Sequence, residues 1–308
     1  MTTITSRLRV RGQTRPPRSR PRSDLRAAAM FVLPATIGFV VFYLWPALRG
    51  VYYSFTDFSV LSPAEWVGTD NYETLIQDDL VWNAFGVTLQ YVLINIGAQT
   101  VLAMGLAVLM HRLTKSMAVR GALLLPYLVA NVVVALTWWW MLDYQIGIVN
   151  QGLDWVGIDR VAFFGDSAWA IPTIAMINVW RHVGYTALLI FAGLQTIPPH
   201  LYEAAALDGS GEVRTFFKIT LPLLRPVLAM VLVITVTGSF QIFDTVAVTT
   251  AGGPVNATRV IYYYIYDLAF TRYEFGYASA LSVVLFVVLS SVAFAQIKLL
   301  RAGESDLA

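Results

Sequence analysis

Six long stretches of the chain are almost wholly apolar, and polar segments of different lengths separate them. A helix needs about 20 mostly apolar residues to cross the roughly 30 Å hydrocarbon core of a bilayer. Each stretch is long enough, and none shows the ten-residue alternation that is typical of a barrel strand. The pattern therefore predicts six membrane-spanning helices, at roughly residues 27–48, 84–110, 117–142, 168–194, 221–243 and 276–300.

The predicted fold class is all-α, a polytopic membrane bundle of six transmembrane helices. Helices and closed barrels are the only structures that satisfy every backbone polar group in lipid. Three prolines fall inside the predicted spans, at Pro34, Pro46 and Pro126. Because proline removes a backbone donor and clashes with the preceding turn, a local kink is expected at each.

The composition agrees with a membrane protein. The chain is 57% hydrophobic and 13% charged, with a mean hydropathy of +0.63. A water-soluble domain carries about 25% charged residues. The absence of cysteine excludes a disulfide scaffold, thiolate metal sites and thiol catalysis.

Arginine and lysine are distributed unevenly around the predicted spans. With the N-terminus in the cytoplasm, the cytoplasmic segments hold 16 of the 21 basic residues and the outer segments hold four. This is the asymmetry that the positive-inside rule requires. We therefore expect a multi-pass membrane protein whose N- and C-termini are both cytoplasmic.

Three regions follow from these patterns. Residues 1–26 form an arginine-rich cytoplasmic tail that we expect to be disordered, residues 27–300 form the transmembrane domain, and residues 301–308 form a short cytoplasmic tail. The arginine density of the first tail could indicate nucleic-acid binding. Basic residues beside a span are far more typical of contact with anionic lipid, so we expect membrane lipid and no nucleic acid as its partner.

The cytoplasmic segment between the fourth and fifth spans, at about residues 198–226, has an unusual sequence. Pro198 and Pro199 end the fourth span, and a short helix is expected from about residue 200 to residue 207. Asp208 and Gly209 tolerate the positive φ of a turn. A short surface helix with small side chains fits a groove on another protein, and an ordinary connecting loop is the alternative.

This segment resembles the EAA loop of ABC-importer permeases. The matching positions are Glu203, Ala204, Ala205, Asp208, Gly209 and Ser210, followed by Phe216, Ile219, Leu221, Pro222 and Pro226 at their spacings; Ser210 stands where alanine is usual. The resemblance implies a type I importer permease fold. It also implies that residues 203–211 form a coupling helix that docks on a cytoplasmic ATPase subunit.

The resemblance covers residues 27–300 and is closest to the carbohydrate-uptake branch, which includes the maltose and glycerol-phosphate permeases. Further matches are Leu125-Pro126-Tyr127, Asn178-Val179-Trp180, Gly193-Leu194-Gln195, Phe240 with Phe243-Asp244, and Gly252-Gly253-Pro254. The resemblance implies three partners: a second homologous permease, a homodimeric ATP-binding subunit and an extracellular solute-binding protein. The chain has no Walker sequence, so ATP would be used by the partner, and no cofactor or metal is expected here.

Polar residues from three spans are expected at one depth. At about 1.5 Å per residue, Asn131, Arg181 and Thr235 each lie roughly 20 Å from the cytoplasmic ends of their spans. Asn178, Arg181, His182 and Tyr185 recur on one face of the fourth span. An ionisable residue at mid-bilayer must face water or protein. Arg181 could therefore line a pathway, or it could pair with a group on another helix, for which Asp244 is a candidate.

The resemblance implies the same layer as the substrate site. The sugar-contacting positions of the maltose-type permease fall here on Tyr127, Asn131, Asn178, Arg181, His182, Tyr185, Thr235 and Ser239. The chain departs from that relative by placing arginine and histidine where apolar or small residues stand. Arginine binds vicinal hydroxyls and phosphate equally well, so two solutes stay open. We expect a di- or oligosaccharide, with glycerol 3-phosphate or a glycerophosphodiester as the alternative.

Other functions agree less well with the sequence. An enzyme is not expected, because the only histidines, His111, His182 and His200, lie in different layers. The acids at positions 70, 73, 78 and 79 are expected on a solvated outer surface. A proton-coupled secondary transporter could use Asp244 and His182 as a relay, but it would not need an EAA-like loop.

Overall fold

The computed structural model describes residues 22–60, 62–113 and 116–299. Residues 1–21 of the predicted tail at 1–26, and the whole predicted tail at 301–308, lie outside these residues. Within the described residues every regular element is a helix, and the extended backbone pairs only at an isolated bridge between Thr56 and Trp66. The chain divides into two compact units, Met1–Arg49 and Gly50–Ala308.

The described part of the first unit is a single apolar helical run. It consists of α1 (Arg22–Phe39), the π-helical turn Val40–Leu44 and the start of α2 (Trp45–Tyr53). The helix therefore begins before the predicted span start at residue 27. None of the side chains described between residues 28 and 49 is buried, which suits a helix whose partners are lipid or another chain.

The prolines of this unit are accommodated without a break. The helix continues through Pro34. The π-helical turn ends at Leu44, two residues before Pro46. The Trp45 backbone N–H closes it by donating to the Val40 carbonyl.

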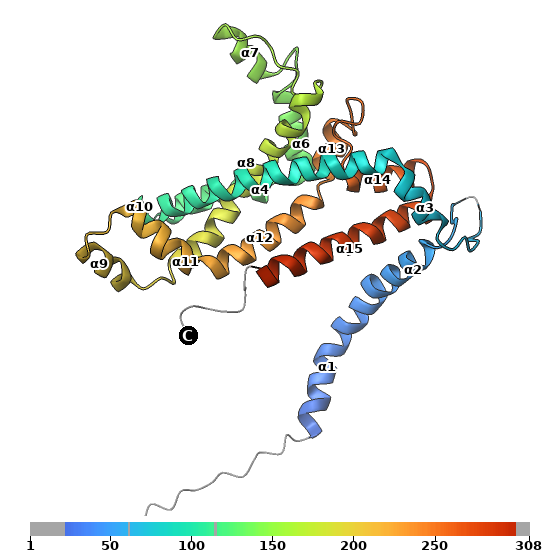
Figure 1. Cartoon of the computed structure of the whole chain (residues 1–308), viewed down its shortest axis with the longest axis horizontal. Coiled ribbons are helices and arrows are strands. Elements are labelled where there is room, and N and C mark those ends of the chain that lie inside the picture. Colours follow the sequence, from blue (N-terminus) through green and yellow to red (C-terminus); the bar gives the residue numbers. More distant parts are fainter. Residues whose placement is uncertain (1–21, 61, 114–115, 300–308) are drawn as a thin grey trace, which may run out of the picture. The chain divides into compact units, whose positions relative to one another are not determined.

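Four long helices form the frame of the second unit (Figure 1). They are α4 (Asp79–Leu113), α8 (Ser167–Leu194), α12 (Arg225–Phe240) and α15 (Phe275–Leu299). Helix α4 packs along α8, and α12 packs against all three of the others. Ala103, Ala107 and Ala187 are fully buried between α4 and α8, and such small side chains let membrane helices approach closely.

Shorter helices connect this frame. They are α3 (Asp70–Gln77), α5 (Met117–Leu128), α6 (Asn131–Met141), α7 (Ile148–Trp155), α9 (Pro199–Leu207), α10 (Glu212–Thr215), α11 (Leu221–Leu223), α13 (Asp244–Thr249) and α14 (Ile261–Tyr266), with π-helical turns at Phe216–Thr220 and Asp267–Thr271.

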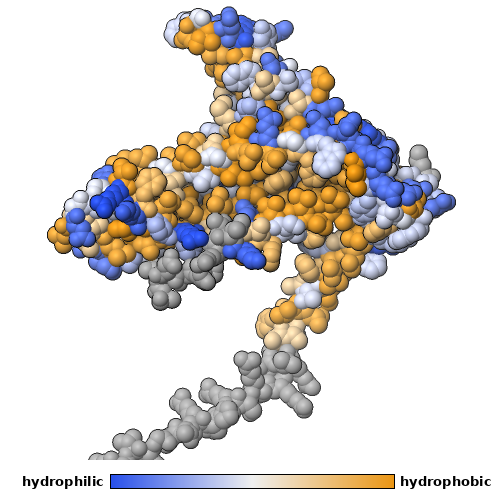
Figure 2. Space-filling model, in the orientation of Figure 1, coloured by the Kyte–Doolittle hydropathy of each residue, from blue (hydrophilic) through white to orange (hydrophobic). Residues whose placement is uncertain are grey.

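By length and composition, five helical segments of the described chain could cross a membrane: Ala28–Tyr53, Asp79–Leu113, Ser167–Leu194, Arg225–Thr249 and Phe275–Lys298. These confirm the predicted first, second, fourth, fifth and sixth spans. In the second unit, the visible face of the long helices is largely hydrophobic, and hydrophilic residues gather near α9 and α10 and near α3 (Figure 2).

The third predicted span differs from expectation. We expected one helix with a local kink at Pro126, but α5 and α6 meet at an angle of 88°. The chain is extended at Val129 and Ala130, where ψ is 140° at both residues. Pro126 lies inside α5, and the break comes after it. The span is therefore two half-helices, and it counts as a sixth crossing only if the bent pair is taken as one.

Arg181 of α8 holds this break. Its Nε and Nη2 donate to the Val129 carbonyl oxygen at 3.2 and 3.0 Å, and Nη2 also donates to the Tyr127 carbonyl at 3.1 Å. The last carbonyls of a helix have no partner within that helix. The guanidinium therefore satisfies backbone groups that the break at α5 leaves open.

Gly184 brings the backbone of α5 within reach of Arg181. A Cβ atom at Gly184 would collide with the carbonyl oxygen of Leu123. Only glycine permits this contact, and it lies one helical turn beyond Arg181 on α8.

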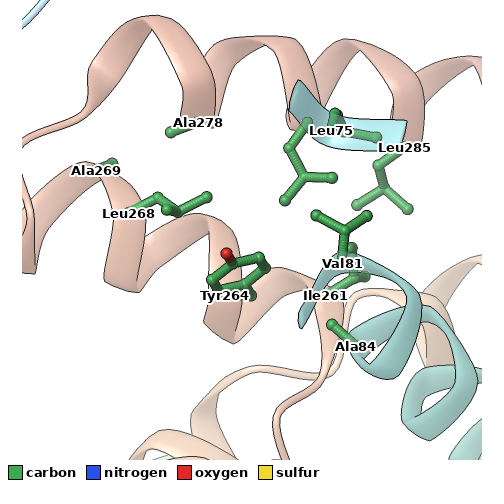
Figure 3. Close-up of a cluster of buried hydrophobic side chains, with 10 residues drawn as sticks. Leu75, Val81, Ala84, Ile261, Tyr264, Leu268, Ala269, Ala278 and Leu285 are labelled. Atoms are coloured by element: carbon green, nitrogen blue, oxygen red, sulfur yellow. The ribbon is translucent and has the colours of Figure 1, made fainter. Parts of the chain in front are cut away.

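One end of the bundle is closed by a separate hydrophobic cluster (Figure 3). Leu75, Val81 and Ala84 come from α3 and α4, and they meet Tyr264 of α14 and Leu285 of α15. All are at most 6% exposed. This cluster joins segments that are almost 200 residues apart in the sequence.

Asp78 lies beside this cluster, at the junction of α3 and α4, and is not simply solvated as expected. Tyr264 and Tyr277 donate their hydroxyls to Asp78 Oδ2 at 2.6 and 2.8 Å, and the Leu80 amide donates to Oδ1. Burial raises the pKa of the Asp78 carboxyl, but these hydrogen bonds lower it more, so its pKa lies below the usual value. The carboxylate is therefore a structural acceptor at neutral pH.

We expect Asp78→Asn to lower the thermal stability of the purified protein, by about 1.5–3 kcal/mol for weakened hydrogen bonds to a charged group. Because the folded pKa is depressed, this stabilisation is present above the unfolded pKa and disappears as pH falls through the folded pKa. Melting temperatures (Tm) at pH 7 and at a pH well below 3.8, the usual value for this carboxyl, measure it. Asp159→Asn, on an exposed loop, is the control, and an equal loss in both variants would contradict the assignment.

We expect Arg181→Ala to reduce the yield and Tm of the purified protein, because a carbonyl left unpaired inside a membrane span, where water is scarce, costs about 1–3 kcal/mol. Arg160→Ala is a matched control. Arg160 also donates to two carbonyls, those of Tyr144 and Gln145, but it lies outside the candidate spans, where water can replace it. Normal yield and Tm together with lost transport would instead mean that Arg181 acts on the solute.

Candidate functional site

A cavity of about 290 Å³ lies among α4, α5, α6, α8, α12 and α13. It brings together seven of the eight residues predicted for the solute site. These are Tyr127, Asn131, Asn178, His182, Tyr185, Thr235 and Ser239. The residues come from four helices of the second unit, so the layer predicted from helix depth exists as a physical space.

Aromatic rings form one wall of the cavity. The rings of Tyr127 on α5 and Tyr185 on α8 stack with their centroids 4.5 Å apart and an interplanar angle of 9°. His182 meets the edge of Tyr127 at 5.7 Å, and its Nδ1 lies 2.9 Å from the Asn178 carbonyl oxygen. The break after Leu128 places Tyr127 near the end of α5, where its ring can face α8.

A second wall is built where two short helices begin. Asn131, the first residue of α6, donates through Nδ2 to Oδ2 of Asp244, the first residue of α13, at 2.7 Å. Asn178 of α8 donates to Thr245 Oγ1 at 3.2 Å and to the Ile174 carbonyl at 2.9 Å. These bonds join α6, α8 and α13 beside the cavity.

Arg181 is the predicted site residue that does not line the cavity. Its guanidinium holds the end of α5, lies 5.4 Å from the centre of the Tyr127 ring and has Nη1 2.9 Å from His182 Nε2. The suggested pairing with Asp244 is replaced by hydrogen bonds to backbone carbonyls, while Asp244 takes its donor from Asn131. Arg181 thus supports the wall that carries Tyr127.

The cavity lining contains further polar residues that were not predicted for the solute site, among them Asn95 and Gln99 on α4 and Thr186 on α8. Gln99 donates to Thr186 Oγ1 at 2.7 Å. The sequence does contain a signal for Asn95 and Gln99, because two amides four residues apart inside an apolar span lie on one helix face. Polar side chains in such a span almost always face the protein interior or water.

The predicted coupling segment folds as a short helix with a defined end. Helix α9 covers Pro199–Leu207, as expected from the sequence. After it, the Gly209 N–H donates to Ala206 and the Ser210 N–H donates to Ala205, and Gly209 has a φ of +70°. This is a Schellman C-cap, in which the residue after the cap adopts the left-handed conformation that glycine favours.

The outer surface of α9 is open. Glu203, Ala204 and Asp208 are exposed, and Leu207 is 89% exposed, whereas Ala205 packs inward. Arg112 at the end of α4 forms a 2.6 Å salt bridge to Glu212 at the start of α10. The segment is therefore attached to α4 through this salt bridge, while the outer surface of α9 is exposed.

Metal chemistry has no candidate ligand set here. In the described part of the chain, no group of three or more His, Asp or Glu side chains is placed to hold a metal ion.

Comparison with known proteins gives a consistent result. The sequence matches the family described as "Binding-protein-dependent transport system inner membrane component" over residues 44–303. The sulfoquinovosyl glycerol transport system permease protein SmoG of Agrobacterium fabrum is 34% identical over 91% of this chain and 92% of its own length. The trehalose/maltose transport system permease protein MalF of Thermococcus litoralis is 31% identical, over 90% and 95%.

Two further relatives widen the range of solutes. The sn-glycerol-3-phosphate transport system permease protein UgpA of Escherichia coli is 34% identical over 86% of this chain and 92% of its own length. Among solved structures, a chain of a bacterial ABC transporter involved in the import of the acidic polysaccharide alginate matches with a TM-score of 0.81 and 26% identity, covering 91% of this chain and 96% of that chain.

The fold, the apolar spans and these matches agree, and the chain belongs to the family of inner-membrane permease components of binding-protein-dependent ABC transport systems.

Proposed function

We propose that this permease carries a neutral di- or oligosaccharide through the cavity, as one half of the pathway of an ATP-driven importer. The observation that carries the proposal is the lining: a stacked tyrosine pair, amides, hydroxyls and one carboxylate, with no lysine or arginine among the described lining residues. A sugar presents hydroxyls that donate and accept hydrogen bonds and an apolar ring face that can pack on an aromatic ring.

The charge of the cavity favours a neutral solute. Asp244 is the carboxylate in the lining, and it lies at the start of α13, where the helix dipole favours negative charge. A phosphate group beside Asp244 would meet like charge at short range. Phosphate sites typically supply arginine or lysine, and Arg181 already donates to the carbonyls of α5.

Glycerol 3-phosphate is the second candidate solute. His182 lines the cavity, and protonation would give it a positive charge that attracts a phosphate. The likeness to the glycerol-3-phosphate permease also supports this candidate. A proton-coupled secondary carrier receives less support, because the chain belongs to a family of binding-protein-dependent systems.

The complete importer in this proposal contains a second homologous permease, a homodimeric cytoplasmic ATPase and an external solute-binding protein. An alginate importer that resembles this chain has been solved in complex with a periplasmic protein carrying an alginate pentasaccharide. A volume of about 290 Å³ is at the low end for ligand pockets, as expected if the second permease supplies another wall.

In the proposed orientation, the N- and C-termini and α9 lie in the cytoplasm. This orientation is supported by the 16-to-4 distribution of basic residues around the spans. ATP is used by the ATPase subunit, and we propose no cofactor and no catalytic role for this chain. The exposed surface of α9, with Glu203 and Leu207, is the part that would enter the ATPase.

The solute is identified by thermal shift of the cognate binding protein with maltose, trehalose and sn-glycerol 3-phosphate, followed by uptake into proteoliposomes that contain the whole importer. We expect a disaccharide to be taken up. Tyr127→Leu and Tyr185→Leu should each reduce its uptake about 3- to 10-fold, the loss of an aromatic contact of about 0.5–1.5 kcal/mol. Tyr144→Leu, at an exposed position outside the cavity, is the control.

Uptake of sn-glycerol 3-phosphate and of neither disaccharide would overturn the sugar proposal in favour of the second candidate. Uptake by vesicles that contain this chain without an ATPase would overturn the importer mechanism altogether.

Coupling to the ATPase depends on the end of α9. Gly209→Val should abolish uptake while the protein still inserts in the membrane, because a β-branched residue resists a φ of +70°. Gly211→Val is a matched control, since Gly211 has an ordinary φ of −67° and neither glycine has atoms nearby that a Cβ would meet. Crosslinking from Leu207 to the ATPase measures docking. Normal uptake by the Gly209 variant would contradict the coupling role.

A further inference from the structure

Hydrogen-bonded polar side chains cross the bundle at the level of the cavity, and we call them the polar ladder. Its members are Asn95, Gln99, Thr186 and Ser239. Asn95 and Gln99 of α4 are 4% and 5% exposed, although they lie inside an apolar span. Asn95 Nδ2 donates to Ser239 Oγ of α12 at 2.8 Å and to Gln99 Oε1 at 3.3 Å. The ladder thus connects α4 to α12, and through Gln99 to Thr186 of α8.

The network fixes the orientation of the Asn95 amide. Ser239 gives its hydroxyl hydrogen to the Thr235 carbonyl at 2.7 Å, so Ser239 Oγ can only accept a bond from Asn95. Gln99 Oε1 is also an acceptor. Both neighbours therefore require the NH₂ group of Asn95, and its Oδ1 must point elsewhere.

Asn95 Oδ1 is buried and receives no hydrogen bond from the protein. A buried acceptor without a donor is costly, and membrane proteins have little water in the bilayer core to compensate. Asn95 is also one of the residues that line the cavity. A molecule in the cavity is therefore close enough to this amide to supply the missing donor.

We infer that Asn95 is a solute-binding residue whose Oδ1 accepts a hydrogen bond from a hydroxyl group of the transported molecule. The inference rests on the proposed function, passage of the solute through this cavity. It adds α4 to the helices that contact the solute, and it assigns the chemistry of that contact. A sugar and glycerol 3-phosphate both carry free hydroxyls, so the assignment holds for either solute.

The test compares Asn95→Leu with Thr100→Val in the reconstituted importer. Thr100 is a matched control because it lies on the same helix and has a buried Oγ1 without a partner, but it does not line the cavity. The probe is whichever of maltose, trehalose and sn-glycerol 3-phosphate gives the largest thermal shift of the binding protein. We expect uptake of that probe to fall at least tenfold in Asn95→Leu and to stay within twofold in Thr100→Val.

Stability measurements separate a solute contact from a structural role. Asn95→Leu also removes the hydrogen bonds to Ser239 and Gln99, so the Tm of the solute-free variant should fall somewhat. If Oδ1 serves the solute, the importer should still assemble in normal yield, and its uptake should fall far more than its stability. Asn95→Ala is the second variant, since it leaves room for water in place of the amide. Loss of assembly in both variants would overturn the inference, as would uptake by Asn95→Leu within twofold of the unmodified importer.

The proposed function fails separately from this inference. Uptake of sn-glycerol 3-phosphate alone would overturn the sugar proposal, and the Asn95 comparison would then be made with the two hydroxyls of that solute.

Discussion

A backbone that stops being helical within a membrane must obtain its hydrogen bonds from elsewhere in the protein. In this permease that condition arises between α5 and α6, where two extended residues follow Leu128. Arg181 meets it by donating from α8 to the carbonyls of Tyr127 and Val129. The close contact at Gly184 brings α5 near enough for this to happen. The 88° turn of the span, and the direction of α6 after it, depend on this interaction.

The same break shapes the cavity. A continuous third span would carry the residues after Leu128 along the axis of α5, whereas the broken span starts α6 at Asn131, which lines the cavity together with the stacked rings of Tyr127 and Tyr185. The Asn131 amide then finds Asp244 at the start of another short helix. Irregular backbone in membrane proteins is tolerated where it lines a cavity or is buried in protein. Here the irregular backbone provides the polar groups that a permease needs and a straight helix would lack.

Hydropathy predicted the positions of the spans well, because crossing lipid demands a length and composition that leave a strong trace in the sequence. The helix of the coupling segment was equally visible, since proline, aspartate and glycine mark its ends at Pro199, Asp208 and Gly209. The break at Val129 could not be predicted from the local sequence, because it is stabilised by the Arg181 side chain, 52 residues away. Residue depth and resemblance found seven of the residues that line the cavity. They missed Asn95: its spacing from Gln99 marks a polar helix face, but the contacts of that face with α8 and α12 are not local in the sequence.

The two helices that flank the predicted coupling segment also supply half of the residues that line the cavity. Helix α8 bears Asn178, His182 and Tyr185 and ends at Leu194, just before α9, while α12 follows α11 and bears Thr235 and Ser239. At the ends nearest α9 and α11, α8 and α12 pack closely, because a Cβ on Gly193 would stand within about 3 Å of the Val227 side chain. Close packing of this kind resists sliding of one helix along the other and transmits strain. We therefore expect a displacement of α9 to reach the cavity as a joint movement of both walls, against α4 and the end of α5 that Arg181 holds.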